Sequence, residues 1–197
     1  MLEPADQLRK PGSCGRSAPD VEIRLLDESG RDVPPGEAGE ICVRSPMLMH
    51  GYYRNDAATR QALHDGFMSV GDVARVDADG YYYIVDRRID MVVSGGVNIY
   101  PAEVEAALLT HPAIADAAVI GVPDPDWGEA LRAYVVRRPD APPLSGSDLE
   151  AELITHCRTC LAGFKIPRRI VAVDDLPYSP SGKVLKRELR ERAREET

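Results

Sequence analysis

Alternating apolar and polar residues predict short β-strands in the first 86 residues. The runs Val21–Leu26 and Gly39–Arg44 alternate with a period of two, which places one face of a strand on a core. Residues 73–76 and 81–85 continue the pattern, and Asp79-Gly80 between them is a strong signal for a hairpin. We therefore expect this part of the chain to form a small, mostly β unit.

From residue 88 onward, helical and strand periods alternate. Pro101 suits the first turn of a helix, and residues 101–110 carry an apolar face until His111-Pro112 interrupts it. Further elements are expected as strands at residues 117–122, 130–136 and 169–173, and as helices at 147–161 and from about 185. The expected fold class is α+β: a β-rich subdomain at residues 1–86, a charged joint at 87–90, and a compact α+β domain at 91–197.

Two short motifs lie on the helix expected at residues 147–161. Ser147-Asp-Leu-Glu150 matches a capping box, which would begin the helix at Ser147. Cys157-Arg-Thr-Cys160 has the spacing of redox and zinc motifs, but it lies late in the helix and lacks a second Cys or His pair. Both thiols are in phase with apolar residues, so we expect them to face a core. No metal site is predicted.

Composition argues against several classes of function. The 197 residues have a formal net charge of -8, whereas general nucleic-acid binding requires a basic surface. No apolar run approaches the length of a transmembrane helix, and the polar N-terminal residues lack the apolar core of a signal peptide. The four cysteines are expected to be reduced thiols, so the expected location is the cytoplasm.

One lysine has a setting that suggests chemistry. The chain has four lysines and twenty arginines, and Lys183 ends the loop Ser179-Pro-Ser-Gly-Lys ahead of a charged helix. An ammonium group on a flexible stem is suited to meet a phosphate or carboxylate oxygen. A solvated lysine in front of a terminal helix is the alternative, so the interpretation depends on other parts of the chain.

Three further stretches could bind a nucleotide. A carboxylate such as Asp72 can bind both hydroxyls of a ribose, and an arginine such as Arg87 can bind phosphate or ribose oxygens through its fork. The glycines of Ser94-Gly95-Gly96 permit close approach of a ligand to the backbone. The alternatives are ordinary structural roles: Asp72 as a cap, Arg87 in a surface ion pair, and Gly95-Gly96 as a turn. Neither GxxxxGK[ST] nor GxGxxG is present.

Taken in order, these segments resemble those of the adenylate-forming enzymes, which include acyl-CoA synthetases, the adenylation domains of peptide synthetases and firefly luciferase. The matching stretches are Gly39-Glu-Ile, Gly51-Tyr-Tyr, Gly71-Asp72, Asp79–Arg87, Asp90–Glu105, His111-Pro112, Val119–Glu129, Leu161–Pro167 and Leu176–Lys183. Within the family, Ser-Gly-Gly-x-Asn-Ile-Tyr-Pro resembles the fatty or aromatic acyl-CoA synthetase branch.

The resemblance implies a two-step reaction. A carboxylic acid and ATP would form an acyl-adenylate and pyrophosphate, and the acyl group would then pass to the thiol of CoA. The implied partners are therefore ATP (and AMP), CoA and a carboxylic acid. Mg²⁺ is expected with ATP, although its ligands would lie outside this chain. The resemblance also implies that the α+β domain is mobile and turns between the two steps.

The resemblance assigns roles to single residues. Asp72 would hold the ribose hydroxyls, Arg87 the ribose–phosphate side, and Lys183 the carboxylate and α-phosphate oxygens during adenylation. Arg88 and Ile89 would form the hinge between the half-reactions. The residues implied in contacts to CoA or its pantetheine arm are Ser94, Gly95, Gly96, Trp127, Phe164 and Arg168. Core or domain packing is the alternative for the two aromatic residues.

The sequence departs from the family in two respects. The hinge position is commonly Asp or Lys in the family, whereas Ile89 occupies it here and could favour one domain orientation by burial. The phosphate loop, a Tyr-Gly-x-Thr-Glu segment and the acyl pocket of the family precede the part that matches. We therefore expect the C-terminal portion of an acyl-CoA synthetase, inactive alone. A docking module that acts in trans and a decayed gene fragment are the alternatives.

Overall fold

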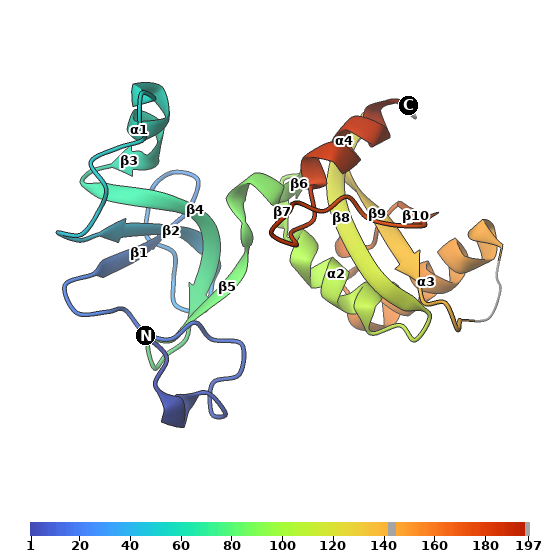
Figure 1. The fold of residues 1–197 in the computed structure, drawn as a ribbon, viewed down its shortest axis with the longest axis horizontal. Helices are drawn as coiled ribbons and strands as arrows, with labels where there is room; N and C mark the ends of the chain where they lie inside the picture. Colours follow the sequence, from blue (N-terminus) through green and yellow to red (C-terminus); the bar gives the residue numbers. More distant parts are fainter. Residues whose placement is uncertain (142–144, 196–197) are drawn as a thin grey trace. The chain divides into compact units, whose positions relative to one another are not determined.

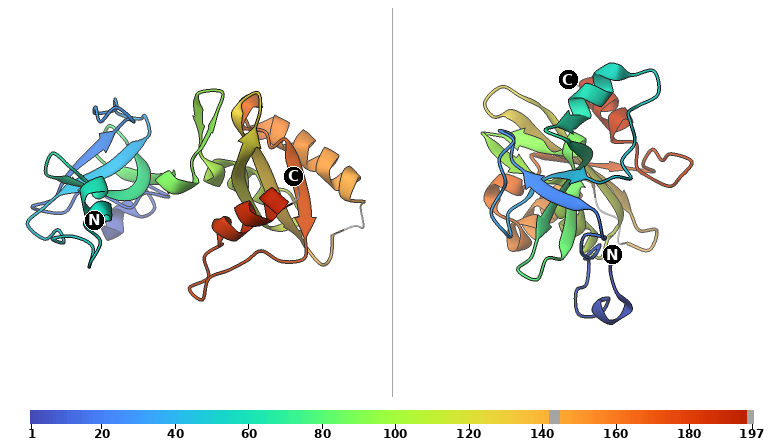
Figure 2. Two further views of the ribbon diagram at one scale, coloured as in Figure 1. Left: turned by 90° about the horizontal axis from the view of Figure 1, so that it is seen from above. Right: turned by 90° about the vertical axis from the view of Figure 1, so that its left-hand side faces the viewer.

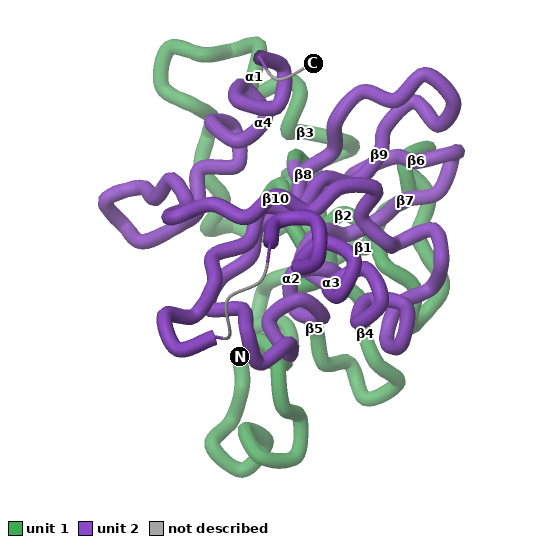
Figure 3. The backbone as a smooth tube through the Cα atoms, turned by 90° about the vertical axis from the view of Figure 1, so that its right-hand side faces the viewer, with its two compact units in different colours: residues 1–89 green, residues 90–197 purple. Residues whose placement is uncertain are grey.

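The computed structural model describes residues 1–141 and 145–195, and the chain divides into two compact units, residues 1–89 and residues 90–197 (Figure 1 and Figure 3). Within the described residues, each unit holds a five-stranded sheet, and four α-helices accompany them. This mixed architecture confirms the predicted α+β fold class. The division falls after Ile89, inside the stretch predicted to be a hinge, and its action as a hinge stays a prediction.

The sheet of unit 1 is antiparallel throughout, in the order β1-β2-β4-β3 with β5 also paired to β4. Alternate residues form two small apolar clusters: Leu25, Ile41 and Ala74 in one, and Leu26, Cys42 and Phe67 in the other. The elements are η1 (Pro4–Asp6), β1 (Glu22–Leu26), β2 (Gly39–Arg44), α1 (Asp56–Ala62), β3 (Leu63–His64), β4 (Phe67–Val76), β5 (Tyr82–Arg87) and η2 (Arg88–Asp90), whose last residue belongs to unit 2. The side chain of Asn55 caps α1 by accepting a hydrogen bond from the amide of Ala58.

Strand β4 is longer than the sequence pattern indicated. The alternation predicted a strand over residues 73–76, but β4 already begins at Phe67, because the turn Asp65-Gly66 folds it back onto β3. Both turn residues have positive φ, which suits a tight hairpin. Gly71, with φ +77°, lies where the register with β2 shifts, so the strand passes through it as a bulge. Asp72 therefore lies inside a strand.

Polar contacts around Tyr81 attach the N-terminal segment to the sheet of unit 1. Tyr81 is buried, and its hydroxyl donates a hydrogen bond to Asp6. Lys10 and Arg16 lie over its ring, 4.9 and 4.4 Å from the centroid. Lys10 also pairs with the Asp77 carboxylate at 2.7 Å. The segment is thus held largely by charge and hydrogen bonds.

Unit 2 has three layers, with helices on both faces of its sheet. Alternate residues of β8 face opposite sides: Val119 joins a cluster with α2 and α3, whereas Ile120 joins one with α4. Figure 2 shows α3 and α4 on either side of the sheet. The elements are β6 (Val92–Ser94), β7 (Val97–Ile99), α2 (Pro101–Leu109), β8 (Ile114–Asp124), β9 (Gly128–Arg137), α3 (Gly146–Cys160), η3 (Gly163–Lys165), β10 (Arg169–Val173) and α4 (Lys186–Glu195).

Helix α3 corrects two predictions. Its N-cap is Ser145 rather than Ser147, because the Ser145 hydroxyl accepts a hydrogen bond from the amide of Asp148. Glu150, predicted to close the capping box, instead accepts a hydrogen bond from the amide of Ile170 on β10. Cys157 is buried as expected, but Cys160 is exposed at the helix end, so only one thiol faces the core. Burial raises the pKa of Cys157 to about 11, which keeps this thiol protonated.

Candidate active site

Asp72 and Arg87 are direct partners across β4 and β5. Directly opposite residues of an antiparallel pair point to the same face, so these two side chains leave the sheet together. Both line a hollow of about 750 Å³ in unit 1, formed by Glu40, Tyr52, Ala58, Gln61, Ala62, Ser69, Val70, Gly71, Asp72, Arg87, Arg88 and Ile89. The structure thus places a carboxylate and a guanidinium at the wall of one cavity.

The predicted hinge residues follow directly after Arg87. Arg88 pairs with Glu40 on β2 at 2.9 Å, and Glu40 also accepts a hydrogen bond from the hydroxyl of Ser69. Ile89 is 77% exposed. The next residue, Asp90, pairs with Arg190 on α4 at 2.8 Å. Arg88 is therefore tied to unit 1 and Asp90 to unit 2, with Ile89 between them.

The Ser94-Gly95-Gly96 segment forms the tight turn between β6 and β7. Ser94 pairs with Val97, and both glycines have positive φ, +57° and +78°. Gly95 also donates a backbone hydrogen bond to the carbonyl of Trp127 at 2.9 Å. A Cβ atom on Gly95 would lie 2.5 Å from the indole ring, so only glycine leaves room for Trp127 here.

A second hollow, of about 400 Å³, gathers five of the six residues predicted to contact CoA: Ser94, Gly95, Trp127, Phe164 and Arg168. Gly96 is not part of its lining. Arg168 lies 5.9 Å from the Trp127 ring and pairs with Asp124 at 3.3 Å. Trp127 and Phe164 are 51% and 53% exposed, so neither is a core residue of unit 2.

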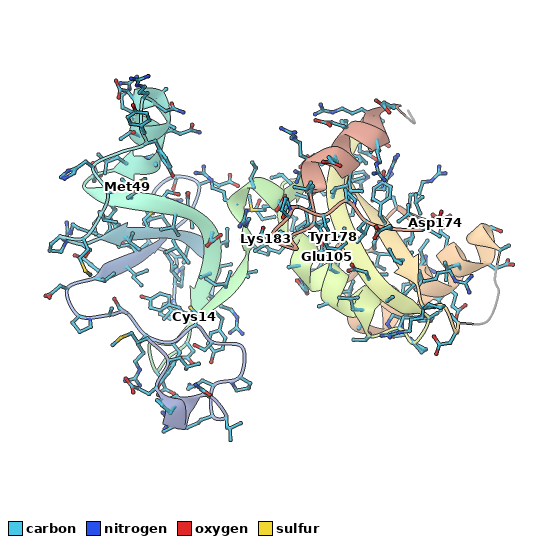
Figure 4. The ribbon with its side chains drawn as sticks, viewed as in Figure 1. Cys14, Met49, Glu105, Asp174, Tyr178 and Lys183 are labelled. Carbon is cyan, nitrogen blue, oxygen red and sulfur yellow. The ribbon has the colours of Figure 1, made fainter. Side chains whose placement is uncertain are left out.

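Lys183 lies at the tip of a closed loop in unit 2 (Figure 4). Tyr178 and Val184 form an isolated β-bridge at its base, and Gly182 turns the chain with φ +76°. The Lys183 side chain is exposed, and within the described parts of the chain its amine makes no ion pair. By contrast, the other three lysines all bind carboxylates, at 2.6–2.7 Å: Lys10, Lys165 and Lys186.

The predicted residues thus form three groups, each within one unit. Asp72 and Arg87 share the hollow of unit 1, five CoA-contact candidates share the hollow of unit 2, and Lys183 has its own loop. Sequence reasoning missed Glu40, Asp124 and Glu105, the carboxylates that hold Arg88, Arg168 and Lys186. Each of these carboxylates is far in sequence from the basic residue that it binds. No local pattern therefore marks them as ion-pair partners.

The described residues lack two other kinds of feature, a metal site and a membrane-spanning helix. No group of three or more His, Cys, Asp or Glu side chains is arranged to hold a metal ion within residues 1–141 and 145–195. In the same ranges, every helix falls short of the length or apolar character needed to cross a bilayer.

Known proteins share both the sequence and the fold of this chain. The family described as AMP-binding enzyme matches residues 1–53, and that described as AMP-binding enzyme C-terminal domain matches residues 103–183. Over 193 residues, the chain is 48% identical to a feruloyl-CoA synthase of Amycolatopsis sp and 39% identical to a long-chain-fatty-acid–CoA ligase of Escherichia coli O6:H1. These alignments cover 98% of the chain, and 38% and 33% of the two relatives.

A solved structure gives the same result. The o-succinylbenzoate CoA synthetase of Bacillus subtilis, in complex with its acyl-adenylate intermediate, matches 96% of this chain and 37% of its own. The TM-score is 0.82 and the identity 38%. The chain thus spans about a third of the length of the curated relatives it matches. It belongs to the family of AMP-binding, adenylate-forming enzymes.

Proposed function

We propose that the chain carries part of the active site of an AMP-forming acid–CoA ligase. In the first half-reaction, a carboxylate oxygen attacks the α-phosphorus of ATP, which forms an acyl-adenylate and releases pyrophosphate. In the second, the thiol of CoA attacks the acyl carbon, and AMP leaves. The names of the relatives suggest a fatty or an aromatic acid as the substrate class.

Asp72 and Arg87 would hold the nucleotide. A carboxylate can accept hydrogen bonds from both ribose hydroxyls, and a guanidinium can donate to ribose or phosphate oxygens. Because the two residues are cross-strand partners at one cavity wall, a single nucleotide can contact both side chains. Mg²⁺ would accompany the triphosphate as its counter-ion, and we assign it no ligand in this chain.

Lys183 would supply the positive charge for adenylation. Negative charge develops on the oxygens around the α-phosphorus as the carboxylate attacks, and a positioned ammonium group stabilises it. The observation that carries the proposal is the contrast among the lysines. Three have carboxylate partners at 2.6–2.7 Å, whereas Lys183 projects from a closed loop toward solvent. Such an amine is available to a ligand.

The hollow of unit 2 would receive CoA in the second half-reaction. The Trp127 and Phe164 side chains offer aromatic faces for an adenine ring, and Arg168 offers a cation for its phosphates. Because Gly95 has no Cβ, the indole lies directly against its backbone, and both residues form the wall along which a narrow pantetheine arm would pass. These contacts support the assignment of the second step to this hollow.

The α+β domain would turn between the half-reactions about Arg88 and Ile89. Arg88 is tied to Glu40 of unit 1, and Asp90 is tied to Arg190 of unit 2. The backbone torsions of Ile89 lie between these anchors, so a rotation centred there would leave both ion pairs intact. Lys183 would leave the reacting atoms in this rotation, and the Ser94-Gly95-Gly96 turn would approach them.

A chimera tests the proposal. Residues 1–197 would replace the matching 38% of the Amycolatopsis feruloyl-CoA synthase, whose sequence is 48% identical over this region. We expect acid-dependent exchange of pyrophosphate into ATP, and a loss of about 100-fold or more in Lys183→Ala, because one preorganised charge is removed. Lys165→Ala, which removes a lysine paired with Glu103, is the matched control and should keep its rate. Full exchange activity in Lys183→Ala would overturn the proposal.

A further inference from the structure

We propose that Glu105 and Asp116 are positioning residues that fix the loop of residues 177–185, here called the lysine loop, and so set the point that the Lys183 amine reaches. The inference rests on the proposed role of Lys183 in adenylation. It assigns a role to two carboxylates that do not themselves touch Lys183.

The lysine loop is closed by its own hydrogen bonds. The amide of Leu185 donates to the carbonyl of Pro177 at 2.7 Å, and the amide of Ser179 donates to the carbonyl of Lys183 at 2.8 Å. The amide of Lys183 donates in turn to the hydroxyl of Ser179 at 3.1 Å. The loop is therefore a compact hairpin, and its position depends on how its two ends are attached.

Glu105 attaches the end that follows Lys183. Its Oε1 pairs with the ammonium group of Lys186, the first residue of α4, at 2.7 Å. The same oxygen accepts a hydrogen bond from the amide of Val119 on β8 at 2.8 Å. The Glu105 and Lys186 side chains are 19% and 13% exposed, so solvent screens their attraction little. This carboxylate thus joins α2, β8 and the start of α4.

Asp116 attaches the end that precedes Lys183. The hydroxyl of Tyr178 donates a hydrogen bond to its carboxylate. Asp116 lies on β8 where the pairing with β9 shifts by one residue, and the amide of Ala117 donates to its other oxygen at 2.8 Å. Figure 4 labels Glu105, Tyr178 and Lys183 together on unit 2. Both anchors therefore connect to β8, the strand that pairs with β9.

Apolar packing completes the support beneath the lysine loop. Leu176 belongs to the cluster that contains Tyr134 of β9 and Leu189 of α4, and the partly buried Val184, on the other side of the loop tip, packs against this cluster. The two ends of the loop are thus held by packing and by one carboxylate each. Its tip, with the exposed Lys183, is the part that remains available to a substrate.

Hydrogen exchange on the 197-residue chain tests the anchoring directly. In Glu105→Gln, and separately in Asp116→Asn, the amides of Ser179, Lys183 and Leu185 should exchange about five- to tenfold faster, because a charge-assisted contact is lost. Glu103→Gln is the matched control. Glu103 lies on the same helix and pairs with Lys165 at 2.6 Å, so its loss should leave the lysine loop unchanged.

Two outcomes would overturn the anchoring. Loop exchange could remain at the wild-type rate in both variants, or it could rise equally throughout unit 2, which would show a general loss of stability. Neither readout depends on turnover. A chimera without activity would therefore count against the proposed function while the anchoring result still stands.

The half-reactions of the chimera test positioning. Glu105→Gln should lower the kcat of adenylation about fivefold or more and leave the KM for ATP unchanged, because the amine is displaced while the nucleotide contacts remain. Thioester formation from supplied acyl-adenylate should keep its rate, because Lys183 has no role in it. An equal fall in both half-reactions would show that Glu105 only stabilises the fold, and would overturn its positioning role.

Discussion

The two units differ in what holds them together. Among the residues that the structure describes, unit 2 buries fourteen in one apolar cluster and six in another, whereas each cluster of unit 1 contains three. Unit 1 also exposes large apolar side chains, among them Met47 at 75% and Tyr53 at 85%. It relies instead on charged contacts such as Lys10 with Asp77. Unit 2 should therefore respond mainly to loss of apolar volume, and unit 1 to loss of charge.

The largest effect is expected from the core of unit 2. Leu153 on α3 is fully buried, so Leu153→Ala should cost about 2–5 kcal/mol of the free energy of unfolding. Trp127 is the single tryptophan and lies in unit 2, so its fluorescence during urea unfolding reports on this unit. Leu63→Ala is the control, because this side chain belongs to unit 1 and is 47% exposed. It should leave the midpoint of the unfolding transition reported by Trp127 unchanged. A cost below about 1 kcal/mol for Leu153→Ala would contradict the claim that unit 2 depends more than unit 1 on buried apolar volume.

Acid should weaken unit 1. The hydrogen bond from the Lys10 ammonium group lowers the pKa of Asp77 from 3.8 to about 2, and the hydroxyl of Ser29 does the same for Asp27. These carboxylates contribute stability above the unfolded-state pKa of 3.8, and the contribution is lost as pH falls toward 2. The protection of the β4 and β5 amides, measured against their intrinsic exchange rates at each pH, should therefore fall between pH 4 and pH 2, a window that follows from these two values.

A matched variant checks the cause of this acid effect. The double substitution Asp27→Asn and Asp77→Asn should flatten the pH dependence of the protection in β4 and β5, since neither asparagine side chain can take up a proton in this range. The two side chains are in unit 1, so the fluorescence of Trp127 should be the same as in the wild type at each pH. An undiminished pH slope in the double variant would show that other groups govern the acid response.

Substitution of Gly95 should disturb unit 2 locally. Gly95→Ala places a Cβ 2.5 Å from the Trp127 ring on a residue with φ +57°, so the indole must move. The backbone strain alone is about 1–2 kcal/mol. Gly96→Ala has similar φ but no neighbour within 4 Å of the new atom, and it is the control for strain without a clash. We expect a shifted Trp127 emission spectrum only in Gly95→Ala, and equal spectra would contradict the close contact.

The smallest effect concerns the cap of α3. Ser145→Ala should cost about 1 kcal/mol, because the amide of Asp148 loses its acceptor. Ser147→Ala should cost less than half of that, about 0.5 kcal/mol or below, since Ser147 lies inside the helix. Urea unfolding followed by Trp127 fluorescence measures both. A larger cost for Ser147→Ala would restore the capping box that the sequence suggested.

Local patterns predicted most elements of both units. The strands Gly39–Arg44 and Arg169–Val173 were placed at their observed bounds, because alternation and flanking turn residues act within a few positions. The start of β4 was missed although Asp65-Gly66 carries a hairpin signal. The exposure of Cys160 could not be predicted from its position on the helix. Helical periodicity shows which side of the helix a residue lies on, but not how far along the helix that side is covered by neighbouring elements.

The candidate site was predictable only through combinations of residues. Lys183 was distinguished from Lys186 by its loop, but the reason that they differ is Glu105, 81 positions earlier than Lys186 in the chain. The contact between Gly95 and Trp127 is likewise formed by two separate turns of the sheet. Such pairings arise from tertiary folding, so no local pattern in the sequence records them.

The most direct test compares the two half-reactions in two variants of the chimera with the feruloyl-CoA synthase. Our account predicts that Lys183→Ala loses adenylation by about 100-fold or more and keeps thioester formation from supplied acyl-adenylate. It predicts the reverse for Trp127→Ala, with adenylation kept and the KM for CoA raised. If Lys183→Ala retained adenylation, or if each variant lowered both half-reactions equally, the assignment of one step to each group of residues would be wrong.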